Sequence, residues 1–562
     1  MFHSFAKKWP VKGNGFLFLV FLLAISFRIL ILIHYRHAIS FDESHFIRLA
    51  GNFSEKGIRG VLHPYWPFLY PFLISFFNLL IGNLELSARI LNVLSGAFLP
   101  VLIYWLTDEL FGKKEARLAA ILVALHPILV YNNTNALTET LYSAAAIGGI
   151  LVGWKALKTH KIKWMCMTGI LFGGSYLFRP EGVGFLVVFL GFLTIQVILK
   201  KIKLLIGTKM LIAIILGFII VSSPYFLYLK KSTGKWTLST KGMVNQQMES
   251  AVYFNEGEIK DPFFHLTEDN QYLPYDMALH FGNIQELTKL HEGHQRIVHI
   301  SIGKYLKKYF MNMSQLFRKT IPEFITLTLL IMLIIGFFTK SYSLDQWWFV
   351  SYLVAYFIFF WCLLIPLFHV NQRYLYPLFP LLFIWISKGC WFLYGWILDN
   401  IREIFKFKKM PNSKRNAIVI ISCIVFVGFI PGWVKLLLIQ PDNTGMWTEP
   451  VELKRAGLWL KENTSHPPVL MSLNKAVDYY AGQYDMRKGA SFSYDSLNRN
   501  LEYAHHRGVE FIVVDSRYLD WFPNLKPFFE INGEKKELEL VYKDNRPLGI
   551  QTLIYRLIYK NK

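Results

Sequence analysis

Cysteine and acidic residues are both scarce in this sequence. Its 562 residues include 4 cysteines, and 38 Asp and Glu stand against 60 Lys and Arg. The cysteines all fall in apolar runs, which excludes a disulfide framework that staples an exported loop; they are Cys166, Cys362, Cys390 and Cys423. No internal repeat and no low-complexity tract is evident, which argues against a transporter built from two structural repeats.

Apolar residues, by contrast, are abundant. They make up 53% of the chain, and 17% of it is Phe, Trp or Tyr. The first apolar run, 15–35, follows a basic start and lacks a small-residue cleavage site, so we interpret it as a retained signal anchor. Runs of this length match the thickness of a bilayer core. We predict a polytopic α-helical membrane protein with about 11 transmembrane helices, near residues 15–35, 86–106, 115–131, 139–157, 164–178, 182–199, 209–229, 321–339, 347–368, 374–397 and 416–438.

The formal net charge of +22 follows the positive-inside rule and does not indicate a nucleic-acid partner. With the N-terminus in the cytoplasm, the stretches assigned to the inside carry 21 Lys and Arg, and four outer loops carry 6. This orientation places the loops at about 36–85 and 230–320, together with the C-terminal tail, outside the cytoplasm.

The composition changes sharply near residue 440. A helical stretch at 449–462 is followed by the strand-like runs PVLMS, EFIVVDS, LELVYKD and QTLIYRL. The sequence therefore predicts two domains. Residues 1–439 form a transmembrane catalytic domain, and residues 440–562 form a small soluble α/β domain on the extracytoplasmic side.

Four polar clusters border the predicted spans on their outer side. They are FDESHF (41–46), NNTNALTE (132–139), RPEG (179–182) and HVNQRY (369–374). Any one of them alone would be an ordinary interfacial cap. Four together, with acids and arginines mixed, predict a shared site at the mouth of a cavity between helices.

The adjacent acids Asp42 and Glu43 are the most informative pair. A carboxylate at the mouth of a dry cavity is suited to act as general base toward an acceptor hydroxyl. The pair could also help to hold a divalent ion, although nothing in the sequence requires one. His291, His294 and His299 lie close together by sequence, but their spacing is common by chance and predicts no metal site.

FDESHF resembles the FDE-x-HF signature of the protein O-mannosyltransferases. More broadly, the chain is similar to the GT-C superfamily, which includes bacterial aminoarabinose transferases. HPYWPFLYPFL, the RPEG turn and QRYLYPLFP are also similar to these families, and the resemblance covers roughly residues 15–390. The tail differs, because it is not the β-trefoil module of eukaryotic mannosyltransferases.

The resemblance implies an inverting, mannosyltransferase-like transfer from a polyprenyl-phosphate sugar donor. It implies a base role for Asp42, a supporting role for Glu43 and a second acidic position at Glu139. The acceptor would be a hydroxyl of a protein, a glycolipid or a polysaccharide. The enzyme would lie in a bacterial or archaeal cell membrane with its active site facing outward.

A lipid-phosphate leaving group needs cationic partners at the interface. Arg179 and Arg373 lie next to spans and suit this role, and interfacial snorkelling is the alternative for each. The remaining predicted substrate-binding residues are Glu181, Tyr374, His63 and Arg89. Arg28, near the middle of the first span, must face the bundle; its candidate partners are Glu139, Glu181 and a donor phosphate.

Two other functions compete with glycosyl transfer from a monophosphate donor. One is a transporter or flippase for lipid-linked glycans, and the other is a glycan ligase or polymerase with a diphosphate-linked donor. The FDESHF motif weighs against both.

Overall fold

The computed structural model describes residues 14–242, 244, 262–287, 302–339, 342–368, 370–405, 427–437, 449–530, 537–545 and 550–559. The chain divides into two compact units. Unit 1 comprises residues 1–34, 92–223 and 302–440, and unit 2 comprises residues 35–91, 224–301 and 441–562.

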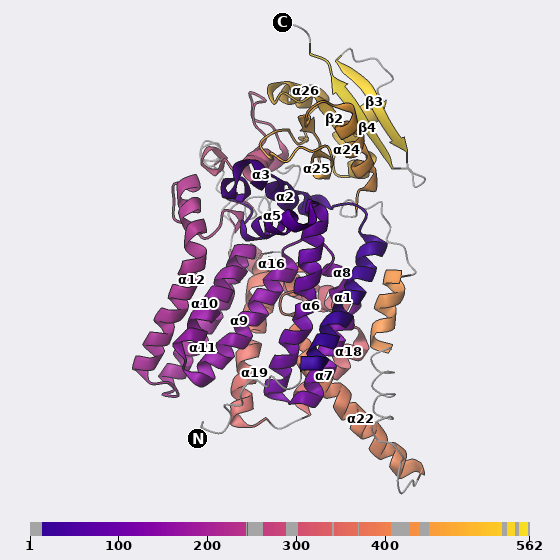
Figure 1. Cartoon of the computed structure of the whole chain (residues 1–562). Helices are drawn as coiled ribbons and strands as arrows, with labels where there is room; N and C mark the ends of the chain where they lie inside the picture. The colour runs from indigo at the N-terminus through magenta and orange to yellow at the C-terminus, as the bar shows by residue number, and fades with distance from the viewer. Residues whose placement is uncertain are drawn as a thin grey trace. The chain divides into compact units, whose positions relative to one another are not determined.

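Unit 1 consists of helices over its described residues, and α9 to α12 lie side by side (Figure 1). Its long helices, some of which continue into unit 2, are α1 (Asn14–Tyr35), α6 (Leu84–Leu110), α7 (Lys113–Leu125), α9 (Glu139–Thr159), α10 (Ile162–Phe178), α11 (Val183–Ile198), α12 (Leu204–Thr233), α16 (Ile302–Gln315), α18 (Leu327–Phe338), α19 (Leu344–Phe357) and α22 (Phe383–Phe405). Shorter turns connect them: α8 (Pro127–Asn132), η1 (Pro180–Gly182), η4 (Leu316–Thr320), α17 (Ile321–Phe324), η5 (Ile358–Leu364), α20 (Ile365–Leu367), α21 (Gln372–Leu375) and η6 (Phe379–Leu382).

Seven helices among the described residues are long and apolar enough to cross a membrane, or eight if one bent pair counts as a span. The chain is thus a multi-pass membrane protein, but the predicted count of about 11 is not confirmed. The predicted span at 115–131 is divided, because α7 ends at Leu125 and Pro127 begins α8. The span at 321–339 is bent by 103° after Phe324. Most of 416–438 lies outside the described residues; Val427–Leu437 is a short apolar helix.

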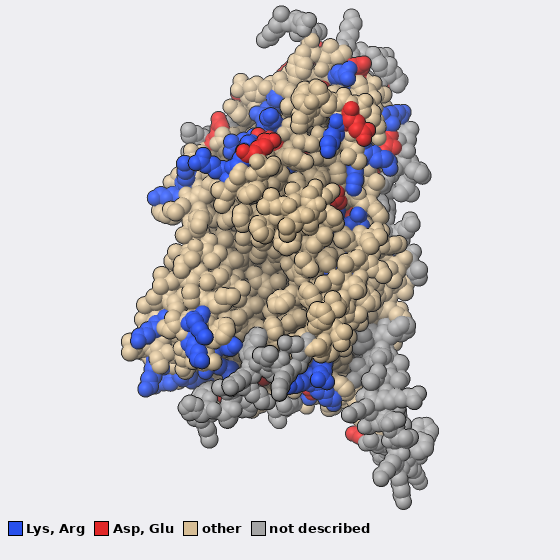
Figure 2. All heavy atoms as spheres, in the orientation of Figure 1, with Lys and Arg blue, Asp and Glu red and all other residues tan. Residues whose placement is uncertain are grey.

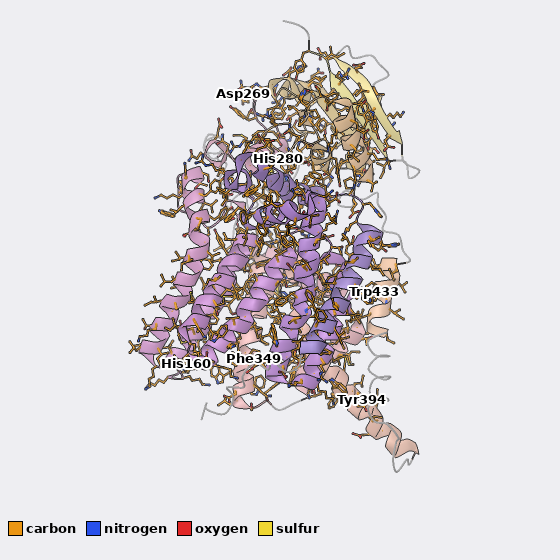
Figure 3. All side chains as sticks on the ribbon, in the orientation of Figure 1. His160, Asp269, His280, Phe349, Tyr394 and Trp433 are labelled. Atoms are coloured by element: carbon orange, nitrogen blue, oxygen red, sulfur yellow. The ribbon has the colours of Figure 1, made fainter. Side chains whose placement is uncertain are left out.

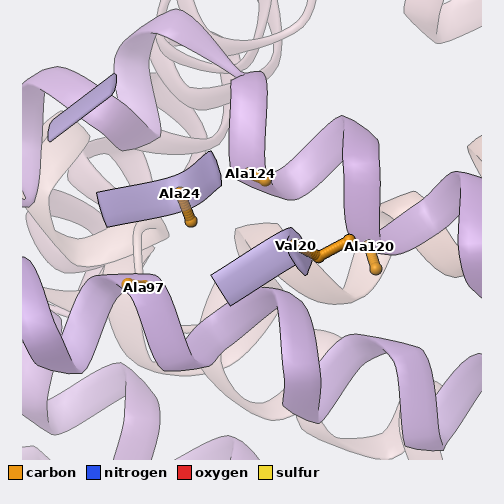
Figure 4. Packing of buried hydrophobic residues seen from close by; sticks show 5 residues of the cluster. All are labelled: Val20, Ala24, Ala97, Ala120 and Ala124. Atoms are coloured by element: carbon orange, nitrogen blue, oxygen red, sulfur yellow. The ribbon is translucent and has the colours of Figure 1, made fainter. Parts of the chain in front are cut away.

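Small residues allow the helices of unit 1 to approach closely. Val20 and Ala24 of α1 pack with Ala97 of α6 and with Ala120 and Ala124 of α7 (Figure 4). In a membrane, close van der Waals packing of this kind replaces the hydrophobic effect as the force that joins helices.

The crossing of α18 and α22 depends on two glycines in the same way. A Cβ atom at Gly336 would collide with the Trp385 carbonyl oxygen, and one at Gly389 would collide with that of Met332. The backbones of α18 and α22 are therefore in direct contact.

The surface of unit 1 carries a broad band without charge. Figure 2 shows this band over the helices, with Lys and Arg side chains gathered at one end of α10, α11 and α12. His160, labelled at this end in Figure 3, closes the short α9–α10 turn in a left-handed conformation (φ 52°). The distribution agrees with the basic loops seen in the sequence.

Unit 2 joins three stretches of sequence around a small mixed sheet. Its helices are α2 (Phe41–Gly51), α3 (Phe53–Lys56), α4 (Ile58–Val61), α5 (Leu69–Ile81), η2 (Pro262–Phe264), α14 (Pro274–Asp276), η3 (Met277–Phe281), α24 (Val451–Asn463), α25 (Ala476–Tyr480), α26 (Leu497–His506), η7 (Ser516–Tyr518), η8 (Pro523–Leu525) and α27 (Lys526–Glu530). Its strands are β1 (Leu470–Met471), β2 (Phe511–Asp515), β3 (Leu538–Asn545) and β4 (Gln551–Leu557).

The sheet has the order β1-β2-β4-β3 and confirms the four predicted strands. β1 and β2 are parallel, with Leu470 opposite Phe511, and the other two pairs are antiparallel. All five residues of β2 are buried, as expected of a central strand. The structure adds that residues 441–562 form one compact unit with 35–91 and 224–301.

Within unit 2, the C-terminal tail is hydrogen-bonded to helix α2 through the buried Arg48. Its Nε donates to the Gln483 carbonyl oxygen and its Nη2 to that of Asp485, both at 3.0 Å. The Asp478 carboxylate lies 3.6 Å from Nη2, and both side chains are fully buried. At the other end of α2, the Ile39 amide donates to the Tyr480 hydroxyl (2.9 Å). Helix α2, which carries Asp42 and Glu43, is thus fixed at both ends by the tail.

We expect Arg48→Met to destabilise unit 2 by about 3–5 kcal/mol, since it removes the cation paired with the buried Asp478 carboxylate and the donor of two carbonyls. Arg48→Lys keeps the charge but loses the planar fork, so its effect should be smaller. The matched control is Arg59→Met, on the exposed side of α4, which should stay within about 0.5 kcal/mol of wild type. Thermal unfolding of the purified protein measures this; equal stability of Arg48→Met and Arg59→Met would contradict it.

Candidate functional site

In unit 1, three of the four polar clusters contribute to one charged group around Glu139. Glu139 begins α9 and is buried. Its Oε1 accepts from Arg179 Nη1 at 2.8 Å and from Arg373 Nε at 2.6 Å. Glu181 Oε1 lies 3.6 Å from Arg179 Nη2. The structure thus brings together residues that lie up to 234 positions apart in the sequence.

The backbone explains why these side chains meet. Arg179 follows α10 in an extended conformation, which turns its side chain out of the helix direction before Pro180 begins η1. Asn371 caps α21, accepting a hydrogen bond from the Arg373 amide at 3.0 Å. The Tyr374 ring lies 5.1 Å from the Arg179 guanidinium, a cation–π contact. All five predicted residues of unit 1 therefore belong to one cluster; His369 lies outside the described residues.

The two arginines of the cluster differ in their access to solvent. The two arginines and two glutamates balance formally, and Glu139 also lies at the N-terminus of α9, where the helix dipole favours negative charge. The Arg373 side chain is 38% exposed, whereas that of Arg179 is 7% exposed. Arg373 is therefore the more accessible of the two guanidinium groups.

Arg28 does not pair with Glu139 or Glu181. Its Nε donates to Asn133 Oδ1 (3.0 Å), and its Nη1 donates to the carbonyl oxygens of Ala24 (2.9 Å) and Ala124 (3.2 Å). Ala124 lies in the last turn of α7, whose final carbonyls lack helical partners. Arg28 thus stabilises the break between α7 and α8, a structural role.

In unit 2, the adjacent acids Asp42 and Glu43 have different environments. Glu43 is buried, accepts from the Ser40 amide at 2.6 Å in a capping box, and lies 3.7 Å from Arg89 Nη1. Asp42 is half-buried. Burial raises the pKa of Tyr275 well above its ordinary value, and the charges of Asp276 and Asp42 raise it further.

Arg89 and His63 have partners that suit structural roles. Arg89 Nη2 donates to the Ala38 carbonyl oxygen (2.8 Å) and to Glu85 (2.9 Å), which fixes the segment before α2. His63 Nδ1 accepts from the amides of Tyr65 (3.1 Å) and Trp66 (3.3 Å). Burial lowers the pKa of His63 to about 3, so it is neutral and unsuited to attract a phosphate.

A buried polar network beside α2 was not foreseen from the sequence. His280, labelled in Figure 3, donates from Nδ1 to Asp276 Oδ1 at 2.8 Å. Asp276 Oδ2 accepts from the Ser491 amide (2.8 Å) and the Tyr503 hydroxyl (2.9 Å). The His45 ring of FDESHF stacks on Trp66 and lies 5.2 Å from the His280 ring. The i, i+4 spacing of Asp276 and His280 is the one signal that the sequence offers.

This network is neutral at its imidazoles and charged at its carboxylate. Burial would raise the pKa of Asp276, but the hydrogen bonds from His280 and Ser491 and the charge of Lys475 hold it below its ordinary value. Burial lowers the pKa of His45 and His280. Both rings are therefore uncharged at neutral pH, which suits packing against aromatic side chains.

Among the described residues, no group of three or more His, Cys, Asp or Glu side chains is arranged to hold a metal ion. His291, His294 and His299 lie outside that part of the chain. Cys166, Cys362 and Cys390 are free thiols, and Cys423 lies outside the described residues.

Comparison with protein families finds one match in the sequence. Residues 63–227 match the model of the dolichyl-phosphate-mannose-protein mannosyltransferase family. The match covers RPEG and Glu139 but begins after FDESHF. A comparison with curated proteins finds no match.

Solved structures with the same fold cover nearly the whole chain. The archaeal oligosaccharyltransferase AglB from Archaeoglobus fulgidus, in complex with an inhibitory peptide and a dolichol-phosphate, has a TM-score of 0.56 at 13% identity, over 96% of this chain and 74% of its own. ArnT from Cupriavidus metallidurans gives 0.53 at 11% identity in the apo state, over 96% and 98%. ArnT bound to undecaprenyl phosphate gives 0.52 at 11% identity over the same shares.

These likenesses confirm the predicted resemblance to the GT-C superfamily at the level of the fold. The family match lies within the predicted range 15–390, and the structural matches extend through the tail to 96% of the chain. The chain therefore has the GT-C membrane fold that AglB and ArnT share.

Proposed function

We propose that this protein is an inverting glycosyltransferase that moves a sugar from a polyprenyl-phosphate donor to an acceptor hydroxyl on the non-cytoplasmic face of the membrane. The observation that carries the proposal is the difference between the two adjacent acids. Glu43 is committed to the capping box and to Arg89, whereas Asp42 on the same helix turn is half-buried. Glu43 thus holds the helix, and we assign the chemical role to Asp42 because its carboxylate is the more accessible of the two.

In the proposed step, the acceptor oxygen attacks the anomeric carbon on the face opposite the donor phosphate. The bond between that carbon and the phosphate oxygen breaks, and the lipid phosphate leaves with the electron pair. Asp42 takes the proton of the acceptor hydroxyl as general base. Attack opposite the leaving group inverts the anomeric configuration.

Arg373 and Arg179 are proposed to receive the phosphate. Without Glu139 between them, two guanidinium groups this close would repel each other, so the carboxylate keeps them together until an anion arrives. A planar guanidinium also matches two phosphate oxygens at once. AglB is known with a dolichol-phosphate and ArnT with undecaprenyl phosphate, and this shared ligand class supports the same class here.

Asp42→Asn should lower the transfer rate by about 10²–10⁴-fold, because the amide keeps the size of the carboxylate but not its basicity. Glu43→Gln should lower it less, and Glu55→Gln, an exposed acid on α3, should leave it unchanged. The assay is mass spectrometry of glycosylated product formed from a lipid-linked sugar extract by purified protein of verified stability. Near-normal transfer by folded Asp42→Asn would exclude the base role. Movement of lipid-linked glycan without any transfer by wild type would indicate a flippase.

Arg373→Ala should raise the KM for the donor about 10–100-fold, the loss expected for one charge-assisted hydrogen bond, and leave the acceptor KM near wild type. Arg373→Lys should recover part of the donor affinity, since it restores the charge without the fork. Lys209→Ala, an exposed cation of the same unit, is the control. A variant with lowered thermal stability but wild-type donor KM would mean that the Glu139 cluster is structural only.

The predicted orientation places α3 and the tail outside the cytoplasm. In a background without native cysteines, Ser54→Cys and Ser465→Cys should react with an impermeant thiol reagent in intact cells. Lys203→Cys, in the basic turn before α12, should react only after permeabilisation. The reverse labelling pattern would overturn the outward-facing site.

A further inference from the structure

Helix α16 and its continuation through η4 and α17 have an apolar stripe that no described residue covers. Ile302, Leu306, Phe310 and Phe317 are 80%, 53%, 65% and 51% exposed. The first three are four residues apart, so they share one face of the helix. Three large apolar side chains on one face, followed by the exposed Phe317, are more than scattered surface residues.

The opposite side of this helix is basic. Lys304, Lys307, Arg318 and Lys319 are exposed; helical spacing places Lys304 opposite the Ile302–Phe310 face and Lys307 at its border. A third side packs on the protein, where the Tyr309 hydroxyl donates to the Cys362 carbonyl oxygen (2.6 Å) and Asn312 Nδ2 to that of Pro366 (2.9 Å). The helix thus has one face for protein, one apolar face and one cationic face.

Charge and geometry both argue against a membrane-spanning role for residues 302–324. Residues 302–324 hold five Lys and Arg, and a charge at the bilayer centre costs about 2.5–3.5 kcal/mol on insertion scales. The segment is bent by 103° from α18, whose backbone contacts α22 within the candidate span Phe379–Asn400. If α22 crosses the bilayer, α18 runs with it and residues 302–324 run nearly along the membrane plane.

We propose that α16 lies on the bilayer surface, with the Ile302–Leu306–Phe310–Phe317 stripe in the acyl layer and its lysines among anionic lipid phosphates. A basic amphipathic helix of this kind is held by buried apolar area together with attraction to anionic headgroups. The occupant of the exposed face is therefore a lipid surface.

This placement also sets the level of the Glu139 cluster. Glu323, at the end of the segment, accepts a hydrogen bond from Gln372, and Gln372 precedes Arg373. Since α16 lies at the headgroup layer, Arg373 is held near the depth at which a lipid phosphate is found. The inference does not depend on Asp42 or on glycosyl transfer.

Spin labels at single cysteines test the proposal in the full-length protein, in a background without native cysteines. Positions 302, 306, 310 and 317 are compared with Lys307, Ser314 and Arg318 in vesicles with and without phosphatidylglycerol. We expect labels on the stripe to be accessible to oxygen and labels at the other positions to be accessible to an aqueous nickel chelate. Accessibility should alternate with the period of a helix, and label depth should not change steadily from 302 to 318. With phosphatidylglycerol present, Lys307→Glu should move the stripe labels toward water.

Three results would overturn the proposal. A steady change of depth from 302 to 317 would mean that the segment spans the bilayer. Access of nickel to the stripe would place it in water, and protection from both reagents would mean that protein covers it. If neither phosphatidylglycerol nor Lys307→Glu changed the accessibility of the stripe labels, anionic lipid would have no role in holding the helix. Transfer assays do not enter these readings, so failure here is distinct from failure of the proposed function.

Discussion

A charge inside a lipid-embedded helical bundle must find its partners within the protein, because the surrounding hydrocarbon supplies none. This constraint organises unit 1. Arg28 donates to Asn133 and to the Ala124 carbonyl at the end of α7, which allows α7 to break at His126 and Pro127. Glu139 accepts from Arg179 and Arg373, which ties the starts of α9, η1 and α21 together. These polar residues, which interrupt apolar stretches of the sequence, thus connect the helices of unit 1 to one another.

The Glu139 cluster is also the part of unit 1 to which we assign donor binding. A buried ion pair contributes little net stability, since desolvation offsets most of the Coulomb attraction. The difference in exposure between Arg373 and Arg179 separates an outer arginine from an inner one, and the proposed phosphate contact depends on that difference.

In unit 2, the corresponding requirement is that the short helix α2 be held in a fixed position. Helix α2 has 11 residues, too few to be stable by itself in water. Its capping box, the bond from Ile39 to Tyr480 and the buried Arg48 provide the missing constraint. The tail differs from the β-trefoil of eukaryotic mannosyltransferases. In this protein its contacts hold the helix that carries Asp42. A rigid helix positions a side chain more reproducibly than a loop does.

Local pattern in the sequence determined the class of the protein and much of its outline. Apolar runs of bilayer length, the basic loops and the four alternating tail segments depend on residues close in sequence, and the membrane helices and strands followed from them. The residues of the Glu139 cluster were also predicted individually, because charged residues beside apolar runs stand out. Tertiary structure alone decided their pairing: that Arg28 meets Asn133 instead of an acid, that Arg48 meets the tail 435 residues away, and that Asp276 binds His280 beneath α2. It also decided where spans break, since Pro127 and the bend after Phe324 depend on how neighbouring helices satisfy the interrupted backbone. Periodicity specifies which face of a helix is apolar, but only packing specifies what that face meets.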